Sequence, residues 1–73
     1  MNDFTQPLFR VSLAAARVNA GLGQREMAKT LGVSVSTITN WESGKTEPTA
    51  NQLRKISEIS QIPMDFIFVP GRS

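Results

Sequence analysis

The chain has 73 residues, of which 40% are hydrophobic, and this length and composition predict one domain with a compact core rather than a disordered tail. It contains no Cys, His or Tyr. This composition excludes disulfides and cysteine-based metal sites, and it removes the usual side chains for acid–base chemistry near neutral pH. We therefore expect no catalytic residues, no metal site and no cofactor.

Positive charge is concentrated in one part of the chain. The net charge is only +2, but residues 10–45 carry five basic and two acidic side chains, whereas the other residues carry three basic and four acidic ones. A local surplus of this kind suits an anionic partner; an ordinary solvated surface is the alternative. No apolar run approaches the roughly 20 residues of a membrane span, and no signal-peptide pattern is visible, so no membrane association is expected.

The first helix is predicted to run from about Pro7 to Ala20. Thr5 is suited to its N-cap, and Pro7 falls in the first turn, where a missing N–H is tolerated. Gly21 suits the position after the helix because glycine adopts the left-handed conformation readily. The apolar side chains at helical spacing, which predict the buried stripe, are Phe9, Leu13, Ala16 and Ala20.

Two short helices joined by a tight turn are predicted at about residues 24–43. Gly32 ends the first of them, Ser34 caps the second, and Gly44 ends the second. A connection of about three residues suits a sharp crossing rather than two antiparallel helices. At about 100° per residue, Ile38 and Trp41 fall on the inner side of the second helix.

Two further helices complete the prediction. Thr49 and Gln52 have the spacing of a capping box, so a fourth helix is predicted from about Ala50. Pro63 is predicted to open a last short helix. No strand pattern is visible. The expected fold is all-α, a compact bundle of five helices in a single domain spanning 1–73, with a core of about 8–69 and flexible residues at 1–6 and 70–73.

These residues carry a family resemblance. The pattern resembles the phage-repressor/Cro-type (XRE) helix-turn-helix family over roughly residues 8–68, nearly the whole chain. The matching positions in and around the two short helices are Arg17, Gly21, Leu22, Gln24, Glu26, Ala28, Leu31, Gly32, Val33, Ser34, Thr37, Ile38, Trp41, Glu42 and Gly44, and the pattern continues through Pro48, Leu53, Ile56 and Ile62.

The resemblance implies a five-helix domain whose third helix enters the major groove while the second crosses the DNA backbone. It implies that Gln24 binds a phosphate, that Lys45 and Thr46 touch the backbone, and that Arg17 and Glu42 form a structural ion pair. The residues that it places at the base edges are Val35, Ser36, Thr37 and Asn40. The sequence departs from the family pattern at Gly23, so the second helix is expected to start less firmly. It departs also at Ile59, Ser60 and Gln61, so the end of the fourth helix is expected to be shifted or packed differently, and Pro63 replaces a capping Ser or Thr before the fifth helix.

The expected reading face is uncharged. No charge occurs from Val33 to Trp41, which is unusual for an exposed helix, although a merely solvated polar face is the alternative. Thr39 shares this face and joins the predicted base-reading residues. Asn pairs bidentately with adenine and Val packs on a thymine methyl, while no Arg or Lys is placed to take guanine, so we expect A·T pairs beneath this helix.

Phosphate contacts are expected at the edges of this face. They are predicted for Gln24, at a helix N-terminus that already favours an anion, and for Lys45. The remaining predicted phosphate contacts are Arg25, Ser34, Ser43 and Thr46. The alternative for the basic residues is simple solvation of the surface. Binding is expected to weaken steeply with salt.

We therefore predict a sequence-specific double-stranded DNA-binding transcriptional regulator, a repressor, in a bacterial cytoplasm or phage-infected host. It is expected to bind a palindromic operator as a homodimer, without a small-molecule ligand. The alternative is an antitoxin or other protein-interaction module of the same fold; an enzyme is the weaker rival. The run from Phe66 to Val69 either seals the core or makes a dimer contact, and both are compatible with its spacing.

Overall fold

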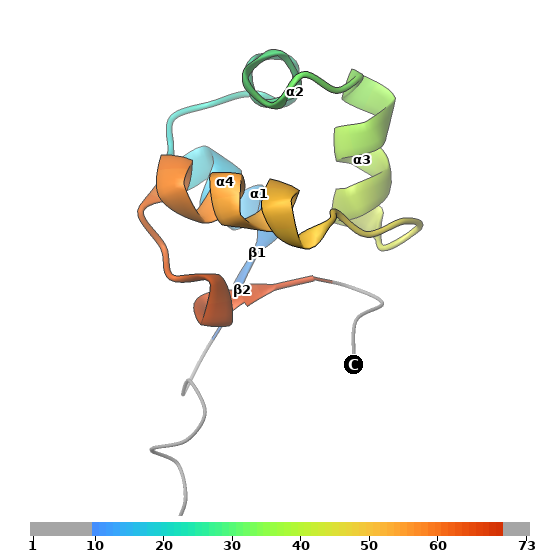
Figure 1. The fold of residues 1–73 in the computed structure, drawn as a ribbon. Helices are drawn as coiled ribbons and strands as arrows, with labels where there is room; N and C mark the ends of the chain where they lie inside the picture. The colour runs from blue at the N-terminus through green and yellow to red at the C-terminus, as the bar shows by residue number, and fades with distance from the viewer. Residues whose placement is uncertain (1–9, 70–73) are drawn as a thin grey trace, which may run out of the picture.

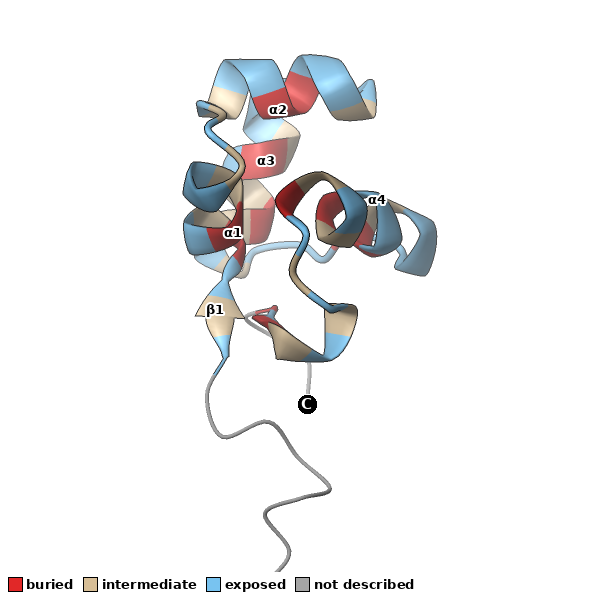
Figure 2. Ribbon diagram, turned by 90° about the vertical axis from the view of Figure 1, so that its left-hand side faces the viewer, coloured by how far each residue is buried: buried red, intermediate tan, exposed pale blue. Residues whose placement is uncertain are grey.

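The computed structural model describes residues 10–69. Within them, two short helices, α2 (Gln24–Leu31) and α3 (Val35–Ser43), confirm the predicted helix-turn-helix. The other elements are β1 (Val11–Ser12), α1 (Leu13–Asn19), α4 (Ala50–Ser60), a 3₁₀ helix η2 (Met64–Phe66) and β2 (Ile67–Phe68). In both ribbon views α2 lies at one end of the molecule and the strands lie toward the other (Figures 1 and 2).

The prediction of a strand-free chain was wrong. Val11 pairs with Ile67, and Ser12 with Phe68, in a parallel ladder of two short strands. The pairing brings together the two ends of the described chain. A two-residue strand leaves no periodic pattern in the sequence, so only the folded structure reveals it.

The first helix begins later than predicted. Its N-cap is Ser12, whose hydroxyl oxygen accepts the Ala15 N–H at 2.9 Å. Because Ser12 and Val11 are extended, the helix cannot continue toward Pro7 through them. The predicted N-cap Thr5 and the residues up to Phe9 lie outside the described residues. Leu13 and Ala16 of the predicted stripe are buried.

The predicted fifth helix was also wrong. Residues 10–69 form four α-helices, and after Pro63 the chain makes only the 3₁₀ turn of η2 before it becomes extended. Ile67 is β-branched and followed by an aromatic residue, both of which favour strands. Side chains alternate between the core and solvent along this extended segment: Ile67 and Val69 are buried, whereas Phe68 is 42% exposed.

The core lies between the four helices and β2, and the buried positions of the helices face one another (Figure 2). Trp41 is 4% exposed, as its predicted position on the inner side of α3 requires. The other buried apolar side chains are Leu13, Ala16, Met27, Ala28, Ile38, Leu53, Ile56, Ile67 and Val69. This core holds α3 at the edge of the bundle with its opposite side exposed. None of the helices within residues 10–69 combines the length and apolar character that crossing a bilayer requires.

The end of α4 accommodates the residues that depart from the family pattern there. Ser60 is buried, and its hydroxyl donates to the Ile56 carbonyl at 2.7 Å, so the polar group is satisfied within the helix. Gln61 then adopts a left-handed conformation, with φ 60°, in place of the usual glycine. The Asn19 side chain donates to the Ser60 carbonyl at 3.1 Å and ties α1 to this end.

Candidate nucleic-acid interface

The turn between α2 and α3 is set by two residues, Gly32, the C-cap of α2, and Ser34, the N-cap of α3. Gly32 has φ 71°, the left-handed conformation, and lets the Val33 N–H reach back to the Ala28 carbonyl at 2.9 Å. Ser34 then caps α3 by accepting the Thr37 N–H at 3.1 Å. Val33 is half-buried and packs against the core, so the angle between the two helices is held from inside.

The side of α3 opposite Ile38 and Trp41 is exposed and uncharged. Among the predicted base-reading residues, Val35, Ser36 and Thr39 are exposed, whereas Thr37 and Asn40 are half-buried at its flanks. Val35 is 39% exposed, one of few large apolar side chains so placed in residues 10–69. The surface therefore offers small polar groups and methyl groups to a partner.

Most hydroxyls of α3 are already bonded within the helix. The Thr39 hydroxyl donates to the Val35 carbonyl at 3.1 Å, and the Ser43 hydroxyl donates to the Asn40 carbonyl at 3.2 Å. Ser34 and Thr37 share a hydroxyl–hydroxyl bond of 2.9 Å. By contrast, the side chains of Ser36 and Asn40 in α3 have no hydrogen-bond partner among residues 10–69.

The C-terminus of α3 places the predicted loop contacts beside the exposed, uncharged side of that helix. Gly44 has φ 84°, and after it the Lys45 and Thr46 N–H groups bond the Asn40 carbonyl at 2.9 and 3.3 Å. The side chains of Lys45, Thr46 and Ser43 are exposed here. One carbonyl thus holds the loop against the helix that carries Asn40.

The start of α2 brings Gln24 to the same end of α3. The N-cap Gly23 has no side chain to bond the first N–H groups of α2. Gln24 is half-buried, and its Nε2 donates to Glu42 Oε1 at 3.0 Å, a bond that the sequence did not predict. Arg25 is exposed and lines an open groove with Lys29 and Ser34.

Arg17 links this cluster to α1. Its Nε lies 2.7 Å from Glu42 Oε2, so the predicted ion pair is present, and both side chains are only 13–14% exposed. Its Nη1 also donates to the Leu22 carbonyl at 3.0 Å. Arg17, Gln24 and Glu42 therefore join the first three helices in one hydrogen-bonded group. This arrangement makes the pair structural rather than a free charged surface.

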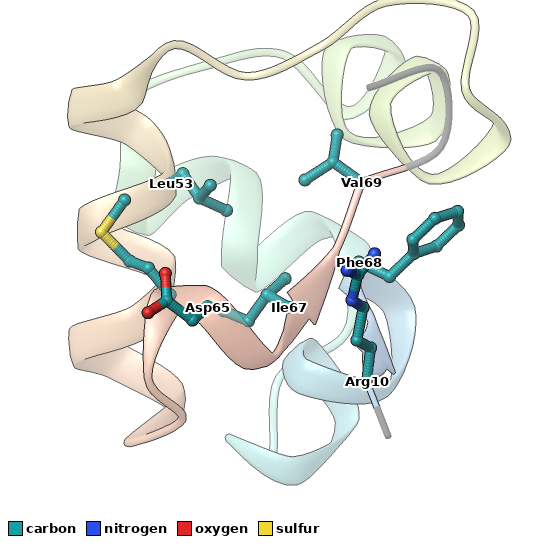
Figure 3. A pocket seen from close by; sticks show the side chains of 7 residues that line it. Arg10, Leu53, Asp65, Ile67, Phe68 and Val69 are labelled. Atoms are coloured by element: carbon teal, nitrogen blue, oxygen red, sulfur yellow. The ribbon is translucent and has the colours of Figure 1, made fainter. Parts of the chain in front are cut away.

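A pocket opens elsewhere, beside β2. Its volume is about 390 Å³, and Leu53, Ile67 and Val69 line it with Arg10 and Asp65 (Figure 3). None of the predicted contact residues line it. Within residues 10–69, no cluster of three or more His, Cys, Asp or Glu side chains is placed to hold a metal ion.

The arrangement of α2, turn and α3 agrees with a sequence comparison. The profile of the helix-turn-helix family matches residues 13–67, most of the chain. The chain belongs to the helix-turn-helix family. The resemblance to its Cro/C1-type (XRE) branch is thereby confirmed. The family is one of DNA-binding transcriptional regulators.

Relatives of this helix-turn-helix chain are named as regulators. It is 36% identical over 45 residues to an HTH-type transcriptional regulator of Haemophilus influenzae, covering 62% of this chain and 19% of that protein. It is 33% identical over 60 residues to the SPbeta prophage-derived HTH-type transcriptional regulator YonR of Bacillus subtilis, and the match covers 82% of this chain and 56% of that protein. It is 32% identical over 57 residues to an HTH-type transcriptional regulator of Sinorhizobium medicae, and the match covers 75% of this chain and 41% of that protein. The matches thus span 19–56% of those relatives. No solved structure matches the chain significantly.

Proposed function

We propose that this protein is a sequence-specific transcriptional repressor that binds double-stranded DNA in a bacterial or phage-infected cytoplasm. The observation that carries the proposal is the exposed, uncharged face of α3, flanked by phosphate-binding candidates at both ends. A helix of this diameter fits the major groove, and the second helix of a helix-turn-helix pair reads base edges there. The names of the relatives support the regulatory role.

Base reading is assigned to the exposed side of α3. Asn40, whose amide is unbonded within the described residues, is suited to the paired donor and acceptor of adenine, and Val35 to a thymine methyl. Ser36 adds a free hydroxyl, while Thr37 and Thr39 complete the surface. Because no cation lies on this face, we expect A·T pairs beneath α3.

Backbone contacts are assigned around that face. A primary amide has two N–H bonds, so Gln24 retains one for a phosphate after it bonds Glu42. The free N–H groups at the start of α2 favour the same anion. The other side chains assigned to phosphate are Arg25, Ser34, Ser43, Lys45 and Thr46. These contacts position the protein, and the bases specify the site.

A symmetric operator follows if two copies bind together. Helix-turn-helix dimers bind half-sites about one helical turn apart, in the major grooves of one side of the duplex. We therefore propose a homodimer on DNA and a palindromic operator.

Selection of binding sites from random duplexes tests the proposal. The wild-type protein should enrich a sequence with A·T pairs at the positions that α3 covers, and Asn40→Ala should lose about 1–3 kcal/mol of discrimination at one of those base pairs. Asn51→Ala, at an exposed position of α4, is the control for fold and expression. Enrichment of invariant G·C pairs beneath α3 would contradict the assignment, and absence of any enriched sequence would contradict the function.

A further inference from the structure

The Thr39 hydroxyl is turned toward its own helix. Its Oγ1 donates to the Val35 carbonyl at 3.1 Å, one turn earlier in α3. A threonine hydroxyl has a single proton, so Thr39 can donate to a base only if this bond breaks. The γ-methyl group and the acceptor lone pairs of the hydroxyl oxygen are the parts of the side chain that remain for a partner.

Val35 and Thr39 lie on the same stripe of α3. Residues four apart face the same side of a helix, and both side chains are exposed, Val35 by 39% of its surface. Their methyl groups therefore form a short apolar strip on a face that carries no charge. Beside it, the side chains of Ser36 and Asn40 have no hydrogen-bond partner among residues 10–69. The two kinds of group are suited to different features of a base pair.

We infer that Thr39 is a specificity-determining residue that recognises a thymine through its methyl group, not through its hydroxyl. This inference rests on the proposed function and deepens it. The major-groove edge of thymine presents a C5-methyl, which cytosine lacks, so methyl–methyl contact distinguishes an A·T pair from a G·C pair. Ser36 and Asn40 then supply the hydrogen bonds of the reading face.

The spacing of the strip limits where this thymine lies. Residues four apart in a helix are separated by about 6 Å along the axis. Successive base pairs rise by about 3.4 Å. The thymine read by Thr39 should therefore lie within two base-pair steps of the one read by Val35.

Two substitutions, of which Thr39→Val is isosteric, separate the methyl from the hydroxyl. Thr39→Val keeps the shape and replaces the hydroxyl with a methyl; Thr39→Ser keeps the hydroxyl and removes the methyl. The probe is the duplex that the wild-type protein selects from random sequences, prepared also with each thymine in turn replaced by deoxyuridine, which lacks the C5-methyl. Circular dichroism and thermal unfolding establish that each variant is folded.

Thr39→Val should bind the selected duplex as the wild type does, whereas Thr39→Ser should bind it roughly fourfold more weakly, the value of one buried methyl-sized group. In one of the deoxyuridine duplexes, the missing methyl should be the one that Thr39 contacts, so wild type and Thr39→Ser should bind that duplex equally. This position should lie within two base-pair steps of the position at which Val35→Ala loses discrimination.

Weaker binding by Thr39→Val would show that the hydroxyl is used and would overturn the inference. Unchanged binding by both variants would overturn it too, because Thr39 then reads nothing. If no duplex is selected, the proposed function fails and this assignment with it; any other result leaves DNA binding intact and judges Thr39 alone.

Discussion

Gln24 and Glu42 meet where the first turn of α2 lies against the last turn of α3, and Gln24 Nε2 donates to Glu42 Oε1 at 3.0 Å. The other oxygen of this carboxylate accepts the Arg17 guanidinium at 2.7 Å. Glu42 therefore holds both the helix that precedes α2 and the residue assigned to a DNA phosphate. If Gln24 binds a phosphate as proposed, substitutions at this carboxylate should affect stability and binding together.

The first prediction concerns the Arg17–Glu42 pair. Removing either partner should lower the free energy of unfolding by about 2–4 kcal/mol, because a charged group is left without its partner in a site that is largely shielded from water. Urea denaturation of Arg17→Ala, Glu42→Ala and the double variant gives the coupling energy. We expect about 1–3 kcal/mol for residues in direct contact.

Arg54→Ala and Glu58→Ala provide the control for this cycle. Both side chains are exposed and lie one turn apart on α4. The Arg54 guanidinium donates to the Asn51 side chain. Exposed opposite charges one turn apart on a helix should couple by less than about 0.5 kcal/mol. An equally small coupling for Arg17 and Glu42 would show that their ion pair does not hold the helices together.

The second prediction separates binding from folding at Gln24. Gln24→Ala should weaken binding to the selected duplex by roughly tenfold, since hydrogen bonds to charged groups contribute about 1.5–3 kcal/mol and part of this is recovered by water. Its free energy of unfolding should fall by only about 1 kcal/mol, because Arg17 still satisfies Glu42. Affinity measured on the folded variant by fluorescence anisotropy checks the first value and urea denaturation the second.

Gln61→Ala is the matched control, since it removes an exposed amide at the far end of α4. It should leave affinity unchanged. A Gln24→Ala variant that binds as the wild type does would remove Gln24 from the phosphate contacts.

The elements predicted correctly are those encoded locally. Gly32, Ser34 and Gly44 each set a helix end through their own backbone conformation or hydroxyl, so the limits of α2 and α3 could be derived residue by residue. The β1–β2 ladder depends instead on two residues meeting two others from the opposite end of the described chain. No local pattern carries that information.

The site shows the same division. Exposure of Val35 and Ser36 follows from helical spacing once Ile38 and Trp41 are recognised as core. The Arg17–Glu42 contact came from the family resemblance. The Gln24–Glu42 bond and the inward turn of the Thr39 hydroxyl depend on rotamers, which the sequence does not specify. The assigned DNA contacts themselves remain predictions.

The third prediction concerns strain at the end of α4. Gln61 has φ 60° and ψ 31°, a conformation that disfavours residues with a Cβ by about 1–2 kcal/mol. Gln61→Gly should therefore raise the free energy of unfolding by about 1 kcal/mol, somewhat less than the full strain because glycine loses more entropy on folding. Chemical denaturation monitored by Trp41 fluorescence measures the change.

The control for this substitution is Glu58→Gly, at an exposed position inside the same helix. Glycine there should destabilise by about 1 kcal/mol, because the helical conformation gives it no advantage. If both glycine variants were stabilised equally, or if Gln61→Gly lowered the free energy of unfolding, the left-handed turn would carry no strain.

The fourth prediction tests whether Lys45 neutralises a phosphate. Its N–H is fixed to the Asn40 carbonyl at 2.9 Å, so its exposed side chain extends from a loop held against the end of α3. Each neutralised phosphate adds about 0.9 to the slope of log affinity against log salt concentration. Lys45→Ala should therefore lower that slope by about 1 and weaken binding uniformly across sequences, without altering base preference.

The control is Lys55→Ala, which removes an exposed cation on α4 outside the assigned contacts and should leave the slope unchanged. Titrations of the selected duplex over a series of salt concentrations measure both slopes; equal slopes for wild type and Lys45→Ala would place this side chain away from the DNA backbone.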